Sequence, residues 1–158
     1  MPMRRADRQV EDPKKICEIL QACQICRLGL QDQDGVYVVP LSYGFSWQGG
    51  VCTLFFHGAQ AGKKLALIEK NPHAGFEMDT AYALQEAESA CSHSARFQSV
   101  MGQGVVRMLQ TQKEKRQALQ AIMAHYRPEK EWEFSEKMLD SVAAFCLQVR
   151  EISCKVHL

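Results

Sequence analysis

Apolar residues recur at helical spacing in several parts of the chain, and most of these parts carry a start or stop signal. The sequence predicts helices over residues 13–24, 62–70, from Thr111 to Arg127, and near 135–140. Asp12-Pro13 places a capping residue before a proline at the first helical position. Thr111 and Glu114 form the pattern of a capping box. Asn71-Pro72 ends the second helix, because a residue before proline avoids helical geometry.

Runs rich in apolar and β-branched residues between these helices predict strands. The strands are expected at 25–30, 36–45, 51–57, 73–79, 97–109 and 142–156. Asp34-Gly35 lies between the first two and is a strong hairpin signal. Pro40 interrupts the second run, which indicates a bulge or an edge strand. Residues 80–95 are polar and aperiodic, so we expect them to be the least structured part of the chain.

This order of elements predicts a mainly β protein with peripheral helices, in a single domain over residues 1–158. Six strands joined mostly by short turns favour a small antiparallel barrel, with helices that plug its ends or pack outside. A doubly wound parallel sheet fits less well, because the first strands have no helices between them.

Composition and charge are those of a globular protein, with 46% hydrophobic and 23% charged residues. The net charge of +1 predicts no general affinity for nucleic acid or for an anionic membrane. We expect no transmembrane helix and no signal peptide, because no apolar run is long enough. The seven cysteines are therefore expected to be reduced thiols in a cytoplasmic protein. Cys17, Cys23 and Cys26 lack the second half of a zinc ribbon, so no metal site is predicted.

The segment GAQAGKK, residues 58–64, has the chemistry of an anion site. Its small residues allow backbone to approach a ligand, and the first N–H groups of the following helix lack partners inside that helix. Lys63 and Lys64 are unfavourable beside the positive end of a helix unless an anion lies there. The alternative is that both lysines are solvated and the glycines only turn the chain. The glycine spacing of a Walker motif is missing.

Other candidates have ordinary structural explanations as well. In VVPLSYGF, residues 38–45, a planar ring could lie along the strand, although strand packing explains the same residues. Gly102 and Gly104 leave one strand face bare, either for a ligand or for a sharply coiled strand. His57 ends a strand beside the proposed anion site and could transfer a proton, yet a lone histidine is more often structural.

Taken together, CRLGL, VYVVPLSYGF, LFFHGAQAGKKLALIEKNPHAGFEMD and SVMGQGVV resemble the FMN-binding split barrels related to pyridoxamine 5'-phosphate oxidase. The branch they resemble most is that of the flavin-nucleotide-binding proteins, which includes the nitroimidazole-resistance proteins. The resemblance covers about residues 3–155. It implies a six-stranded antiparallel split β-barrel that forms a homodimer, with FMN between the subunits.

The resemblance also implies a role for each of ten residues. Those expected along the flavin ring and the ribityl chain are Val38, Val39, Pro40, Leu41 and Ser42. Phe56 and His57 would lie at the edge of the site, with His57 as the candidate catalytic residue that contacts the substrate. Lys63 and Lys64 would bind the phosphate, and Ser99 would complete the pocket.

The function expected on this basis is an FMN-dependent oxidoreductase that reduces small planar acceptors such as nitro compounds. A flavin carrier or sensor without catalysis is the first alternative, since no catalytic base is evident. Haem binding through His57 or another histidine is a further alternative, although no Cys-x-x-Cys-His motif supports it. Vitamin B6 oxidation is not expected, because the chain stops at Leu158 without the substrate-binding Arg and His tail of the true oxidases.

Overall fold

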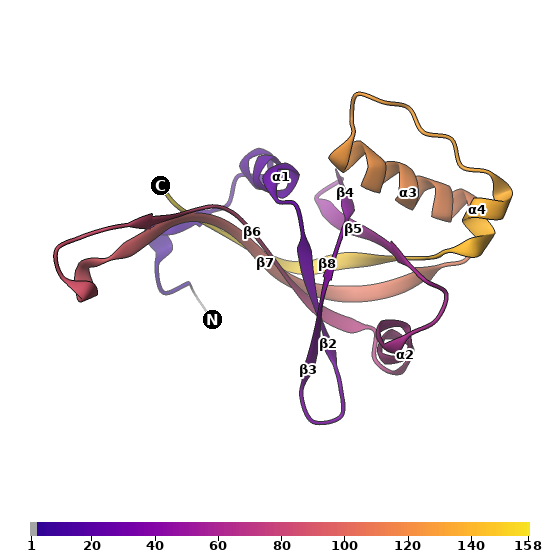
Figure 1. The fold of residues 1–158 in the computed structure, drawn as a ribbon, viewed down its shortest axis with the longest axis horizontal. Coiled ribbons are helices and arrows are strands. Elements are labelled where there is room, and N and C mark those ends of the chain that lie inside the picture. The colour runs from indigo at the N-terminus through magenta and orange to yellow at the C-terminus, as the bar shows by residue number, and fades with distance from the viewer. Residues whose placement is uncertain (1–2) are drawn as a thin grey trace.

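A computed structural model describes residues 3–158, in which long strands dominate and the helices are short (Figure 1). The α-helices are α1 (Pro13–Ala22), α2 (Lys63–Lys70), α3 (Gln112–Tyr126) and α4 (Glu136–Ser141). The strands are β1 (Gln9–Val10), β2 (Cys26–Gln31), β3 (Val36–Leu41), β4 (Gly44–Gln48), β5 (Val51–Gly58), β6 (His73–Gln85), β7 (Ser94–Leu109) and β8 (Ala143–His157). Two single 3-10 turns, η1 (Ala6–Arg8) and η2 (Ala90–Ser92), complete the described part.

Within residues 3–158, eight strands form one sheet in which the pairings are antiparallel. The strand order is β3-β2-β6-β7-β8-β5-β4, and β1 pairs with β8. Consecutive strands β3 and β4 therefore lie at opposite ends of the sheet. The chain crosses between them through Ser42 and Tyr43. An antiparallel sheet that curls but keeps two separate edge strands is the split barrel that the sequence predicts.

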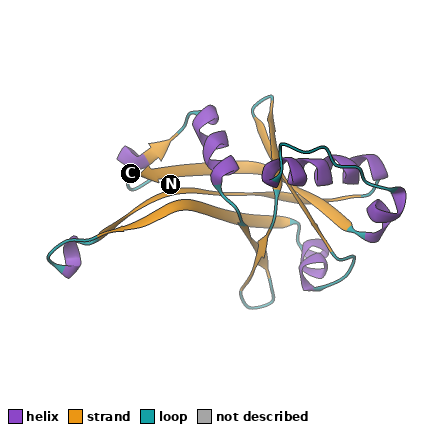
Figure 2. Cartoon of the chain, turned by 45° about the horizontal axis from the view of Figure 1, so that its top comes forward, coloured by secondary structure: helices purple, strands orange, loops and turns teal. Residues whose placement is uncertain are grey.

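The core lies on the inner face of this sheet, and α1 and α3 lie together on one side of the long strands (Figures 1 and 2). Helix α1 buries Ile16, Ile19 and Leu20. Phe56 of β5 and Phe145 of β8 stack with their ring centroids 5.3 Å apart. Every second residue of β5 faces this core. On the other face Phe55 packs against residues of α3 and α4, while His57 is exposed.

The crossing between β3 and β4 is anchored by Tyr43, whose side chain is fully buried. Its hydroxyl donates to the carbonyls of Leu20 and Cys23 at the end of α1. Its backbone N–H donates to the hydroxyl of Tyr126, at the end of α3, over 3.1 Å. These bonds hold the carboxyl end of β3 against two helices, so the position of that strand is fixed by the body of the protein.

The predicted helices are confirmed, and so is the capping box that begins α3. The expectation of six strands is wrong. The run 36–45 forms two strands, because buried Tyr43 turns the chain from one sheet edge to the other. Strand β1 is a further addition, too short for a periodic pattern.

The expectation that 80–95 would be the least structured segment is also wrong. Strand β6 continues to Gln85 and β7 begins at Ser94, so the two extend into a hairpin beyond an irregularity between Thr80 and Ala83. Figure 1 shows this hairpin projecting from the body of the molecule. No third strand covers its end, since β8 finishes with His157 opposite Phe97. Residues 81–84 are exposed, including Tyr82 at 68% and Leu84 at 54%, so the hairpin has no buried face that would reveal it as a pair of strands.

The described residues lack both a helix that could span a membrane and a cluster of metal-binding side chains. Over 3–158, no helix combines the length and the apolar character that crossing a membrane requires. The same residues contain no cluster of three or more His, Cys, Asp or Glu side chains that could hold a metal ion. The seven cysteines are all free thiols.

Candidate functional site

Strand β3 forms one edge of the sheet, because it pairs only with β2. Its residues alternate: Val39 and Leu41 pack against the core, while Val38 and Pro40 face outward. Val38 is 57% exposed, which is unusual for a large aliphatic side chain. Ser42 follows the strand and is exposed as well. The strand therefore offers an apolar surface beside a row of backbone groups without a strand partner.

Phe56 and His57 are neighbours on β5 but point to opposite faces of the sheet. The ring of Phe56 is fully buried and stacks on Phe145, so it faces the core and not the proposed site. The expectation that Phe56 lies at the edge of the site therefore does not hold for its side chain. His57 is exposed on the outside. Partial burial and the positive charge of Lys64 both lower the pKa of His57, so the imidazole is neutral at pH 7.

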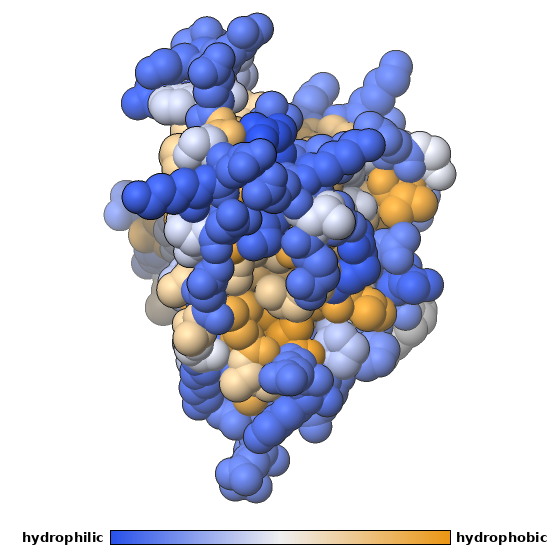
Figure 3. All heavy atoms as spheres, turned by 90° about the vertical axis from the view of Figure 1, so that its right-hand side faces the viewer, coloured by the Kyte–Doolittle hydropathy of each residue, from blue (hydrophilic) through white to orange (hydrophobic). Residues whose placement is uncertain are grey.

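Helix α2 begins in the way that the anion hypothesis requires. Its N-cap is Gly62, with φ of +136°, a conformation that side-chain-bearing residues rarely adopt. No side chain caps the helix, and its first turn contains no acidic residue. Lys63 and Lys64 are its first two residues. The N-terminus thus combines unpaired N–H groups with two cations. Figure 3 shows the right-hand side of Figure 1, where a patch of hydrophobic residues lies among hydrophilic ones.

The two lysines have different surroundings. The Lys64 ammonium lies against Gly58, where an added Cβ would be only 2.9 Å from it. Within residues 3–158, no carboxylate approaches Lys64 closely enough for an ion pair. Lys63 instead contacts the turn between β2 and β3. Its ammonium lies 2.6 Å from Asp32 and 4.9 Å from the ring centre of Tyr37.

Asp32 and Tyr37 were missed by sequence reasoning. Asp32 lies in QDQDG, a segment that the sequence marks only as a hairpin turn. Lys63 lowers the pKa of Asp32 by donating a hydrogen bond to it, and Asp32 raises the pKa of Lys63 in turn. Both groups are therefore charged at neutral pH. The contact joins residues 31 positions apart, so no local sequence pattern predicts it.

Ser99 lies far along the sheet from His57 of the same chain. His57 pairs with Ala144 of β8, whereas Ser99 pairs with Lys155, eleven positions further along that strand. At about 3.3 Å per residue, this is about 35 Å of strand length. The structure thus brings Lys63 next to Tyr37 of β3 and Lys64 next to His57. It separates Ser99 from His57, while the pairing registers of β2, β6 and β7 put Ser99 three strands from the end of β3.

The comparisons with known proteins agree with this architecture. The sequence model of the pyridoxamine 5'-phosphate oxidase family (Pyridox_ox_2) matches residues 12–156. The chain belongs to this family. No curated protein matches it.

Solved structures of similar shape extend the comparison. A candidate 5-nitroimidazole antibiotic resistance protein from Bacteroides thetaiotaomicron is 28% identical, with a TM-score of 0.80 over 94% of this chain and 86% of that one. The flavocytochrome Anf3 from Azotobacter vinelandii is 22% identical, with a TM-score of 0.81 over 99% of this chain and 72% of that one. An FAD and haem binding protein from Mycobacterium smegmatis is 19% identical, with a TM-score of 0.79 over 94% and 73%. The last two similarities show the fold alone.

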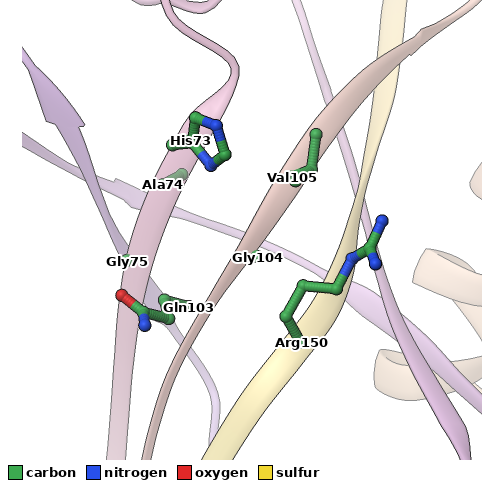
Figure 4. A pocket seen from close by; sticks show the side chains of 7 residues that line it. All are labelled: His73, Ala74, Gly75, Gln103, Gly104, Val105 and Arg150. Carbon is green, nitrogen blue, oxygen red and sulfur yellow. The ribbon is translucent and has the colours of Figure 1, made fainter.

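The outer face of strands β6, β7 and β8 is a second surface that could accept a ligand or a partner. A hollow of about 530 Å³ lies on that face. Figure 4 shows the residues that line it. It is lined by His73, Ala74, Gly75, Gln103, Gly104, Val105 and Arg150. Nearby Met101 is 47% exposed. None of the predicted site residues lines this hollow, although Gly75 lies only two strands from Val38 in the sheet.

Gly102 and Gly104 are explained by strand packing. A Cβ on Gly102 would lie 2.4 Å from the Glu151 carbonyl oxygen, and one on Gly104 would lie 2.1 Å from that of Gln148. Both glycines therefore allow β7 to approach the backbone of β8 at its irregularity after Gln103. Of the two explanations open from the sequence, the coiled strand fits these contacts.

Proposed function

We propose that this protein binds FMN and acts as an oxidoreductase. The observation that carries the proposal is the start of α2, where two lysines and unpaired N–H groups lie close to an exposed edge strand and to His57. Asp32 compensates the charge of Lys63, but Lys64 has no carboxylate partner among the described residues. The charge of Lys64 therefore opposes the helix dipole unless an anion binds there. A dianionic phosphate reverses the sign of that interaction.

The residues present fit FMN in three respects. Lys64 has space and no competing carboxylate among the described residues, so it can hold the phosphate together with Lys63 and the first N–H groups of α2. Val38 and Pro40 offer an apolar surface for the ring, with Val39 and Leu41 anchoring the strand in the core. The free backbone edge of β3 and Ser42 can form hydrogen bonds with polar atoms of the ligand.

We propose that the active form is a homodimer with flavin sites at the subunit interface. A single chain cannot bring Ser99 next to His57, because about 35 Å of strand separates the two residues. A second copy could supply Ser99. The exposed apolar residues Val36, Val38 and Met101 on the outer side of the sheet are typical of a surface that another subunit covers.

We propose further that the acceptor is a small planar molecule such as a nitro compound. The 28% identity to the Bacteroides thetaiotaomicron protein supports this substrate class. When bound, the flavin supplies the electron transfer. The chain positions the flavin, and neutral His57 contacts the acceptor and can exchange a proton with it. The free cysteines fit a cytoplasmic setting for the reaction.

The first test is an absorption spectrum of freshly purified protein, followed by heat release and chromatography of any chromophore. The proposal expects flavin bands and released FMN. Reduced nicotinamide and a nitroimidazole should then be consumed faster than with free FMN alone. Flavin binding without such turnover would favour a carrier or sensor, and a Soret band would favour haem. His57→Ala should lower turnover while leaving FMN affinity within about twofold.

A further inference from the structure

A further hollow, of about 440 Å³, lies on the outer face of the sheet where β1, β7 and β8 meet. It shares no lining residue with the hollow of Figure 4. Its polar lining residues are Gln9, Ser99, Ser153 and Lys155, and Met3 and Met101 add apolar surface. The hollow therefore suits a small molecule that has both an apolar face and a polar edge.

Lys155 lies beside Ser99 in this hollow. The two residues are direct partners in the antiparallel pairing of β7 with β8, and both line the hollow, so their side chains share one face of the sheet. Directly opposed residues of antiparallel strands have their Cβ atoms about 4.5–5.5 Å apart. Any ligand that reaches Ser99 on this face therefore also comes within reach of the Lys155 ammonium.

The charge of Lys155 is not compensated by a neighbouring acid. Lys155 is partly buried, yet no carboxylate of residues 3–158 lies within ion-pair distance of it. Asp79 flanks Ser99 on the other side, but it is bound by Arg27 over 2.7 Å. Because a partly buried cation is stabilised by an anionic or carbonyl oxygen, the hollow favours a ligand that presents such a group.

A flavin ring on β3 of the same chain cannot contact Lys155. The path from β3 to β8 crosses β2, β6 and β7, which makes four strand spacings, or about 19 Å. A ligand outside the barrel has to follow this arc. A second copy of the chain removes the difficulty, because a partner that supplies Ser99 to the flavin site supplies Lys155 with it.

We propose that the partner subunit's Lys155 is a flavin-binding residue, whose ammonium faces the polar edge of the flavin ring at N1 and the C2 carbonyl. The inference rests on the proposed FMN site and the proposed homodimer, and adds to them a residue and its role. The ring is a better match than the phosphate for this hollow. Lys63, Lys64 and the start of α2 already provide for the phosphate, whereas the hollow combines one cation with apolar walls.

The charge of Lys155 matters most when the flavin is reduced. A hydride from reduced nicotinamide, which is two electrons and one proton, leaves the ring with one additional negative charge, spread over N1 and the C2 carbonyl. A cation beside these atoms stabilises the reduced flavin more than the oxidised flavin. Lys155 should therefore raise the midpoint potential of bound FMN, and this potential limits which acceptors the protein can reduce.

The first test measures the midpoint potential of bound FMN in the full-length protein by spectroelectrochemical titration. Lys155→Met should lower the affinity for reduced FMN relative to oxidised FMN at least tenfold, which corresponds to a potential about 30 mV lower. Lys155→Arg keeps the charge and should stay within about threefold of the wild-type ratio. Arg150→Met is the matched control and should leave the ratio unchanged, because Arg150 is an exposed cation of the same strand that does not line this hollow.

A mixed dimer shows which subunit supplies Lys155. A chain with Lys63→Met and Lys64→Met is co-expressed with a Lys155→Met chain under a different affinity tag, and dimers that carry both tags are isolated. Only the Lys155→Met chain keeps the phosphate lysines, so each mixed dimer should bind one FMN. The Lys155 that faces this FMN comes from the other chain, so the midpoint potential should equal that of the wild-type protein. A potential as low as that of the Lys155→Met homodimer would place Lys155 in the site of its own chain and overturn the proposal.

The remaining outcomes separate this inference from the proposed function. An unchanged ratio in Lys155→Met, or an equal loss in Arg150→Met, overturns the role of Lys155 and leaves the FMN site intact. FMN-bound protein that is monomeric by light scattering overturns this inference together with the proposed dimer. Failure of the wild-type protein to bind FMN overturns the proposed function and this inference together. Lys155→Gln gives the same comparison if circular dichroism shows that the methionine variant is not folded.

Discussion

Helices α2 and α3 begin in opposite ways. Helix α3 starts at Thr111, whose hydroxyl accepts the N–H of Glu114, while the Glu114 carboxylate accepts the N–H of Thr111 and a hydrogen bond from Arg107. Helix α2 starts at Gly62 with no side-chain cap, no acid and two lysines. The first N–H groups of α3 thus have hydrogen-bond partners within the chain. Helix α2 has no side-chain partner for its first N–H groups, and this difference is the reason why we propose α2 as the binding element.

The largest expected effect is on FMN affinity, which should depend on the lysines at the start of α2 and not on the lysine at the start of α3. Lys63→Met combined with Lys64→Met should weaken FMN binding at least 100-fold, because two charge-assisted contacts of about 1.5–3 kcal/mol each are lost. Flavin fluorescence titration measures the change. Lys113→Met is the matched control, since Lys113 is an exposed lysine in the first turn of α3. Equal losses in both variants would contradict the assignment of the phosphate to α2.

The next effect concerns stability and α3 alone. Thr111→Ala should lower the free energy of unfolding by about 1 kcal/mol, because the capping oxygen is removed. Urea denaturation measures it. FMN affinity should not change, since the side chain of Thr111 bonds only with Glu114 among the described residues. A stability loss below about 0.3 kcal/mol would show that the cap contributes less than its two hydrogen bonds suggest.

A charge reversal at α2 should move stability and binding in opposite directions. Lys64→Glu places an acid in the first turn and should raise the free energy of unfolding of the ligand-free protein by about 0.3–1 kcal/mol. The same change should abolish FMN retention. If the variant is instead less stable than the wild-type protein, the electrostatic explanation of the α2 start is incorrect.

A smaller effect involves the pKa of His57. Burial lowers this pKa first, and the charge of Lys64 lowers it further. Lys64→Met should therefore raise the pKa of His57, though not fully to its usual value. An NMR titration of the imidazole proton resonances in the ligand-free protein measures the shift. A pKa that falls or stays the same would place Lys64 away from His57 in solution.

The smallest effect is the acid sensitivity of α3. Arg107 and the backbone N–H groups of Thr111 and Gln110 lower the pKa of Glu114 to about 2. A depressed carboxylate pKa stabilises the fold above its unfolded value near 4.5, and this contribution is lost as the pH falls towards 2. Glu114→Gln should reduce the dependence of unfolding midpoint on pH across this window. An unchanged dependence would show that Glu114 is not the titrating group.

The sequence predicted the features that depend on near neighbours. The Thr111–Glu114 capping box and the Asp12-Pro13 start are visible because their partners lie within a few residues. The split-barrel fold was predicted from the family resemblance. Two-residue alternation along β5 could have separated buried Phe56 from exposed His57, although both were assigned to the site.

Features that depend on the assembled sheet were not predictable in the same way. Asp32 meets Lys63 only because the β2–β3 turn folds back on α2. The β6–β7 hairpin has no buried face along residues 81–96, so it lacks the alternation that identifies a strand. The distance between Ser99 and His57 follows from the pairing register of β5, β7 and β8, which the local sequence does not specify.

The most direct test of the account is the affinity of the wild-type protein for FMN relative to riboflavin, which has the same ring but no phosphate. If the start of α2 binds the phosphate, FMN should bind at least 100-fold more tightly than riboflavin, and the ratio should fall close to one when Lys63 and Lys64 are both replaced by Met. Equal affinities for FMN and riboflavin in the wild-type protein would contradict the central claim.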